Sequence, residues 1–191
     1  MNELTKLANK HNTDKGTVAY EAHGYTEEYA KYIPNTGKYK LLEIGVWHGD
    51  SIKMWAEYAP DMEIIGIDND PNVLKYMNKS AWNYDVFIGD ATDEKFLSKL
   101  LDDDNTSVLD IKLDFIIDDG SHVYEDILAA FKLLYPRMNS RGYYFIEDLH
   151  AGHSQRHRLM EDVKKWLYEN DPMYIDLGLF CNDKLWIIQK V

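Results

Sequence analysis

The chain has little that would staple it covalently or carry it through a membrane. Its 191 residues include one cysteine, Cys181, so no disulfide can form within the chain, and this usage fits a reducing compartment. No apolar run approaches the roughly 18 residues of a membrane span, and the N-terminus lacks the apolar core of a signal peptide. We therefore expect a cytoplasmic protein without a membrane-spanning segment.

Positive charge is also scarce. Lys and Arg number 21 against 33 Asp and Glu, which gives a net charge of −12. Such a balance opposes binding to nucleic-acid phosphates, so a nucleic-acid partner is not expected. Hydrophobic residues make up 45% of the chain, as in ordinary globular domains. The 14 tyrosines and 5 tryptophans would allow a homo-oligomer to form through aromatic surface.

The pattern of apolar runs predicts the fold. From about residue 40 onward, strand-length runs alternate with helical patterns, which is typical of a parallel sheet covered by helices. We predict an α/β fold with a single doubly wound, Rossmann-like sheet of seven strands, mostly parallel, ending in an antiparallel C-terminal hairpin. The strands are expected at 40–46, 63–68, 84–89, 113–118, 142–147, 173–180 and 184–191, with helices at 51–59, 72–78, 93–101, 123–138 and 161–170.

The chain divides at the first predicted strand. Residues 1–37 are expected to form a helical or lid segment over a ligand, and residues 38–191 the α/β domain. The N-terminal part carries two groups of polar residues, Thr13-Asp14-Lys15-Gly16 and His23-Gly24-Tyr25.

The first predicted strand leads into a glycine-containing turn, where an open α/β sheet binds nucleotide-like ligands. The segment contains Glu43, Gly45, Gly49 and Ser51. It departs from G-x-G-x-x-G, because three non-glycine residues separate the glycines, and its acid would repel phosphate. A ligand with a positive charge and a ribose suits the turn better than a pyrophosphate.

The following strands end in acids that could hold the rest of such a ligand. Asp68 closes the second strand, where a carboxylate can accept hydrogen bonds from both ribose hydroxyls. Asp90 and Ala91 follow the third strand and could contact an adenine edge. Asp118 ends the fourth strand, and side-chain alternation separates it from Asp119, so we assign Asp118 to the cofactor side.

The fourth and fifth strands end in a second group of polar residues, Asp119 and His122 after the first and Asp148 after the other. Adjacent strands lie about 4.8 Å apart, so carboxylates at the same edge can share one hard cation. His122 could then remove a proton from a hydroxyl beside the cation. A third protein ligand is not evident, and Asp118, Glu147 and His150 are all candidates.

These motifs resemble a known family. LLEIGVWHGDS, IIGIDND, IGDAT and LDFIIDDG are similar to the motifs of class I S-adenosylmethionine-dependent methyltransferases, and IDDGSH, IEDLH, TDKGT and HGYTEEY to metal-dependent sugar O-methyltransferases of macrolide-type natural-product biosynthesis. The resemblance implies that Glu43, Gly45, Asp68, Asp90 and Ala91 line the cofactor. It also implies that Asp119 and Asp148 bind Mg²⁺ and that His122 is the catalytic base, acting beside Asp119.

The expected function is therefore Mg²⁺-assisted transfer of a methyl group from S-adenosylmethionine to a hydroxyl of a sugar or another polyhydroxylated small molecule. The alternatives are a metal-dependent hydrolase or oxygenase on the same fold and a non-catalytic cofactor-binding module. One departure from the family is the missing middle glycine, with Trp47 and His48 in the loop. We interpret Trp47 as a packed aromatic, with contact to cofactor or substrate as the alternative.

Overall fold

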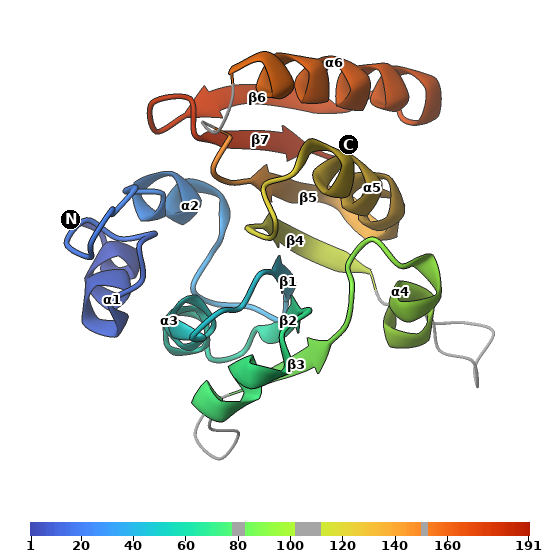
Figure 1. Ribbon diagram of the computed structural model, residues 1–191. Helices are drawn as coiled ribbons and strands as arrows, with labels where there is room; N and C mark the ends of the chain where they lie inside the picture. Colours follow the sequence, from blue (N-terminus) through green and yellow to red (C-terminus); the bar gives the residue numbers. More distant parts are fainter. Residues whose placement is uncertain (78–82, 102–111, 150–152) are drawn as a thin grey trace.

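The computed structural model describes residues 1–77, 83–101, 112–149 and 153–191. Its sheet has the order β3-β2-β1-β4-β5-β7-β6 (Figure 1). Strands β1 to β5 are parallel, and β7 runs antiparallel to both β5 and β6, which confirms the predicted fold class. The strands are β1 (Lys40–Ile44), β2 (Glu63–Asp68), β3 (Tyr84–Ile88), β4 (Leu113–Asp118), β5 (Met138–Ile146), β6 (Ile175–Phe180) and β7 (Leu185–Gln189).

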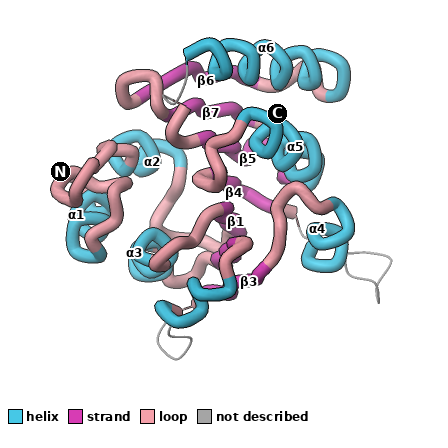
Figure 2. The backbone as a smooth tube through the Cα atoms, viewed as in Figure 1, coloured by secondary structure: helices cyan, strands magenta, loops and turns pink. Residues whose placement is uncertain are grey.

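Helices cover both faces of the sheet, as Figure 2 shows. Helices α1 (Glu3–His11), α2 (Thr26–Tyr32) and α3 (Asp50–Tyr58) pack on one face, and α4 (Glu94–Leu101), α5 (Tyr124–Leu134) and α6 (His153–Asn170) on the other. Each face has its own apolar core. None of the helices in the described part of the chain combines the length and apolar character needed to span a bilayer.

Side-chain alternation decides which face each strand-end residue reaches. Leu41 and Phe115 belong to the core beneath α1 to α3, whereas Leu42 and Ile116 belong to the opposite core. Because the period along a strand is two residues, Glu43 lies on the same face as Leu41. Acids one residue apart in the sequence can thus serve different sides of the sheet.

The predicted helix at 72–78 is wrong in type. Residues Pro71–Tyr76 form the 3₁₀ helix η1, the short form usual in connections. The Asp70 side chain accepts a hydrogen bond from the Asn72 N–H, and Pro71 stands at the first helical position. A second short 3₁₀ helix, η2 (Tyr135–Arg137), follows α5, so the helix predicted over 123–138 ends sooner than expected.

The N-terminal segment shares a core with the sheet. Leu4 and Ala8 of α1, Tyr29 of α2 and the flanking Tyr25 and Ile33 are all fully buried. Tyr29 contacts Trp55 of α3 and Phe145 of β5 edge to face, with ring centroids 5.5 and 4.8 Å apart. Residues 1–37 therefore contribute to the packed interior, and the boundary at residue 38 stays a prediction.

Candidate active site

Two cavities open at the carboxyl ends of the parallel strands. The smaller, of about 190 Å³, lies beside β2, β3 and the start of α5. The larger, of about 530 Å³, lies between the N-terminal segment and the loops that follow β1, β4 and β5. Gly45, Asp68 and Gly120 line both, so the two cavities meet at the ends of β1, β2 and β4.

Six of the eight residues predicted to bind a cofactor line one or both of these cavities. Ser51 lines the larger cavity. Glu43 is fully buried and lines neither cavity. Gly49, which precedes α3 with a φ of 72°, also lines neither. The smaller cavity brings together the other predicted cofactor residues, namely Gly45, Asp68, Asp90, Ala91 and Asp118.

Gly45 is required by close backbone approach. It has a φ of 86°, and a Cβ atom there would lie 2.0 Å from the carbonyl oxygen of Asp119. A larger residue would separate the loop after β1 from the loop after β4. This contact keeps the two halves of the site together.

Asp68 organises the loop after β1. Its Oδ2 accepts hydrogen bonds from the N–H groups of Val46 at 2.8 Å and Trp47 at 3.0 Å. Its Oδ1 accepts one from the N–H of Asp70 at 2.8 Å. Carboxylate oxygens have further lone pairs, so Asp68 can still accept hydrogen bonds from hydroxyl groups in the cavity.

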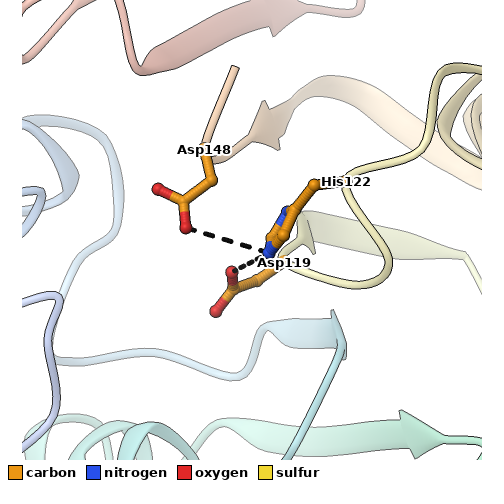
Figure 3. A group of neighbouring side chains, drawn as sticks. All are labelled: Asp119, His122 and Asp148. Atoms are coloured by element: carbon orange, nitrogen blue, oxygen red, sulfur yellow. Dashed lines mark ion pairs between the residues drawn. The ribbon is translucent and has the colours of Figure 1, made fainter. Parts of the chain in front are cut away.

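Asp119, His122 and Asp148 come together in the larger cavity (Figure 3). One potential ligand atom from each lies within 4.8 Å of the others. The Nε2 atom of His122 is 3.9 Å from Asp119 Oδ1 and 3.8 Å from Asp148 Oδ2. His122 and Asp148 have φ values of 57° and 54°, and non-glycine residues in this region often occur at functional sites.

The N-terminal segment fixes the orientation of both acids. Lys15 Nζ donates to Asp119 Oδ2 at 2.5 Å, and the Tyr25 hydroxyl donates to Asp148 Oδ1 at 2.6 Å. Each acid is thus held through one oxygen, while its other oxygen is the one that faces His122. Residues more than 100 positions away in the sequence thereby orient the second oxygen of each acid toward His122.

Lys15 is a buried cation among acids. It is 1% exposed and lies 2.8 Å from Glu147 and 3.4 Å from Glu43. Burial alone would lower the pKa of Lys15, but Asp119, Glu147 and Glu43 together raise it above its ordinary value. Burial, partly offset by Lys15, raises the pKa of Glu43 to about 7.

Two of the three candidates for a third metal ligand, Asp118 and Glu147, make hydrogen bonds with other residues. Asp118 is buried, and burial raises its pKa to about 7. The Tyr144 hydroxyl donates to Asp118 at 3.4 Å. Glu147 accepts hydrogen bonds from Lys15 and the Tyr29 hydroxyl. His150 lies outside the described residues.

Burial and hydrogen bonding act in opposite directions on Asp148. Burial would raise its pKa, but the Tyr25 hydrogen bond and the neighbouring His23 and His122 lower the pKa below the ordinary value for aspartate. The Asp148 carboxylate is therefore ionised at neutral pH. An ionised carboxylate that lines a cavity, as Asp148 does, is a suitable ligand for a hard cation.

The fold and the cavities define an α/β protein with a cavity at the carboxyl ends of its strands, where open sheets of this kind bind nucleotide-like ligands, and with an acid pair beside it. The family model described as "Methyltransferase domain" matches residues 42–149. The chain belongs to this methyltransferase family.

Curated relatives are O-methyltransferases named for mycinamicin and tetracenomycin compounds. The chain is 30% identical over 159 residues to the 8-demethyl-8-(2-methoxy-alpha-L-rhamnosyl)-tetracenomycin-C 3'-O-methyltransferase of Streptomyces olivaceus, covering 77% of this chain and 37% of that protein. It is 26% identical over 156 residues to the Mycinamicin VI 2''-O-methyltransferase of Micromonospora griseorubida, covering 77% and 36%. The chain thus spans little more than a third of the length of these relatives.

Solved structures share the fold. The MycE methyltransferase of the mycinamycin biosynthetic pathway, in complex with Mg and SAH, matches with a TM-score of 0.73 at 22% identity and covers 99% of this chain and 55% of that chain. The SAH-bound Podospora anserina methyltransferase PaMTH1 matches with a TM-score of 0.61 at 16% identity, covering 100% and 89%.

Proposed function

We propose that the protein transfers a methyl group from S-adenosylmethionine to a hydroxyl of a sugar or glycoside, with Mg²⁺ at Asp119 and Asp148. The observation that carries this proposal is the arrangement of these acids around His122. Each acid has one oxygen held by the N-terminal segment and the other directed at the same point.

The residues that line the smaller cavity support this choice of cofactor. Its acids, Asp68, Asp90 and Asp118, oppose a pyrophosphate and favour a ligand with a cationic sulfonium and ribose hydroxyls. Asp68 would accept the ribose hydrogen bonds, and Asp90 with Ala91 would line the base. SAH, the demethylated product of this cofactor, is bound in the MycE structure.

The acid cluster fits a hard divalent cation. Mg²⁺ is usually held by one or two protein carboxylates and keeps several other oxygen ligands. Asp119 and Asp148 supply two carboxylates, and the imidazole of His122 is a poorer ligand for Mg²⁺ than a carboxylate. Asp119 and Asp148 would therefore hold the ion and His122 would stay available for proton transfer. Bound there, the ion supplies Lewis-acid chemistry to a neighbouring hydroxyl.

The chain's own residues then perform two tasks. His122 accepts the proton of the acceptor hydroxyl at Nε2, the atom that faces both acids. Lys15 and Tyr25 hold the acids in place, so that the acceptor oxygen is positioned before it attacks the methyl carbon. Positioning of this kind accounts for much of the rate of a bimolecular transfer.

Calorimetric titration tests the proposal before an acceptor is identified. Purified protein is titrated with S-adenosylmethionine and S-adenosylhomocysteine, each with Mg²⁺ and with a chelator. We expect micromolar binding of both, and methylation of a rhamnoside that requires the ion. Asp68→Asn should weaken cofactor binding at least tenfold, whereas the control Asp61→Asn, which lines neither cavity, should not. Absence of binding under every condition would contradict the proposal.

A further inference from the structure

Trp47 is not a packed aromatic, contrary to the sequence interpretation. The residue is 70% exposed, and its φ of 46° lies in the left-handed region, where a bulky side chain is a genuine outlier. Strained residues of this kind persist where the surrounding structure enforces them, and they cluster at ligand sites. Here the enforcing contacts are the two hydrogen bonds that Asp68 Oδ2 accepts from the N–H groups of Val46 and Trp47.

Trp47 is the most exposed of three aromatic rings that contact one another in succession. Its indole stacks on the His48 ring with centroids 4.0 Å apart and an interplanar angle of 14°. His48 in turn lies 4.5 Å from the ring of Tyr76 in η1. His48 therefore supports the indole from one side, while most of the Trp47 surface remains open to solvent. We call these three residues the aromatic platform.

Two members of the platform line the cavity that holds the acid cluster. Trp47 and His48 line the same cavity of about 530 Å³ as Asp119, His122 and Asp148. Tyr20, which is 89% exposed, lines this cavity as well. The cavity lining therefore combines aromatic side chains with the acid cluster, and apolar surface with a few polar groups is the combination that orients a small ligand.

This inference rests on the proposed function and narrows its substrate class. We propose that the aromatic platform stacks on the apolar C–H face of the acceptor's sugar ring while a ring hydroxyl faces Asp119, His122 and Asp148. A pyranose has an apolar face and a polar rim, so the same ring can contact both groups of side chains. The platform would thus favour cyclic glycoside acceptors over flexible polyols that carry the same hydroxyl groups.

Binding by the platform can be measured without methyl transfer. Protein labelled with 5-fluorotryptophan gives ¹⁹F resonances, and the one that vanishes in Trp47→Phe belongs to Trp47. We expect methyl α-L-rhamnopyranoside to shift this resonance, and glycerol at the same concentration to leave it unchanged. An unshifted Trp47 resonance at saturating glycoside would overturn the proposal.

Kinetics provide the second readout. Trp47→Gly should raise the KM for the rhamnoside at least tenfold, with kcat changed less than threefold and cofactor affinity retained. Glycine accepts a positive φ without strain, so the variant should melt at the same temperature as the wild type or higher, which excludes misfolding as the cause. The control Tyr168→Gly, at an exposed position on α6, should leave KM unchanged. Unchanged KM in an active Trp47→Gly enzyme would refute the platform.

The two proposals can fail separately. A glycoside-dependent shift at Trp47 in a protein that binds no S-adenosylmethionine would support the platform and reject the methyltransferase reaction. Methyl transfer to the rhamnoside with no effect of Trp47→Gly would support the reaction and reject the platform.

Discussion

At the residue scale, Lys15 shows what sequence reasoning missed. The TDKGT motif is visible in the sequence, but nothing in it indicates that its lysine reaches acids 104 and 132 positions away. Glu147 likewise looks like a spare ligand beside Asp148 until the structure shows its hydrogen bonds to Lys15 and Tyr29. Local patterns revealed the acids at the strand ends, whereas the partners that orient them depend on tertiary packing.

Lys15→Met should destabilise the fold by about 3 kcal/mol, because it leaves buried carboxylates without their cation. The control Lys10→Met breaks an exposed ion pair with Glu57 and should cost about 0.5 kcal/mol or less. Since the Lys15 pKa is raised, its contribution is fully present at neutral pH and is lost only as the pH rises through the folded-state pKa. Urea unfolding at pH 7 distinguishes the variants, and equal stabilities would contradict the ion-pair account.

His122→Ala should lower turnover at least 100-fold while cofactor affinity stays unchanged, as expected for a lost general base. The measurement is initial rate against pH, combined with calorimetry for cofactor binding. His11→Ala serves as the control, because His11 pairs with Glu57 and lines neither cavity. A rate within threefold of the wild type would remove His122 from this role.

Asp176 allows a pH test away from the site. Burial would raise its pKa, but hydrogen bonds from Lys164 and Trp186 lower it below the ordinary value. A carboxyl with a depressed folded-state pKa stabilises above its ordinary pKa, and the effect is lost as the pH falls. Asp176→Asn should therefore cost about 1 kcal/mol at pH 7, and this cost should disappear as the pH falls through the lowered folded-state pKa of Asp176. A pH-independent difference in unfolding free energy would contradict this assignment.

At the element scale, the strands were predictable and the connections less so. Continuous apolar runs identified β1 to β5 because buried parallel strands need both faces covered. The helix expected at 72–78 proved to be the 3₁₀ helix η1, since Asp70 and Pro71 start a short turn there. That α1 and α2 pack into the core was also not evident from the sequence, because this packing depends on contacts with α3 and β5.

Deletion of residues 1–32 should abolish cooperative unfolding. It would expose the apolar face beneath α1 and α2 and leave Glu43 and Glu147 buried without Lys15. Circular dichroism on heating is the measurement, and the control Tyr20→Ser changes only an 89% exposed side chain of the same segment. A sharp thermal transition in the deleted protein would show that the sheet folds without this segment.

At the scale of the whole molecule, acidic side chains are concentrated where the strands end. A protein with a net charge of −12 places Glu43, Asp68, Asp118, Asp119, Glu147 and Asp148 at one edge of its sheet. Within the described residues, Lys15 compensates the acids on the side of α1 to α3. A bound cation would relieve more of this repulsion and stabilise the fold.

Mg²⁺ should therefore raise the melting temperature. Binding at 100 times Kd stabilises a folded protein by about 2.7 kcal/mol, and a chelator should reverse the effect. Asp148→Asn retains an acceptor for the Tyr25 hydroxyl but loses the charge, so its melting temperature should hardly respond to the ion. Differential scanning fluorimetry measures both proteins, and an identical Mg²⁺ response in the variant would argue against Asp148 as a ligand.

The hydrogen bonds of Asp68 connect the two cavities. One carboxylate group lines the smaller cavity and also fixes the backbone of Trp47 in the larger one. A cofactor whose hydroxyls donate hydrogen bonds to Asp68 would change how strongly Asp68 holds the backbone of Trp47. Such coupling between two ligands is reciprocal in free energy. We therefore expect a filled cofactor cavity to change the affinity for the glycoside, and bound glycoside to change cofactor affinity by the same factor, giving the enzyme heterotropic cooperativity within a single chain.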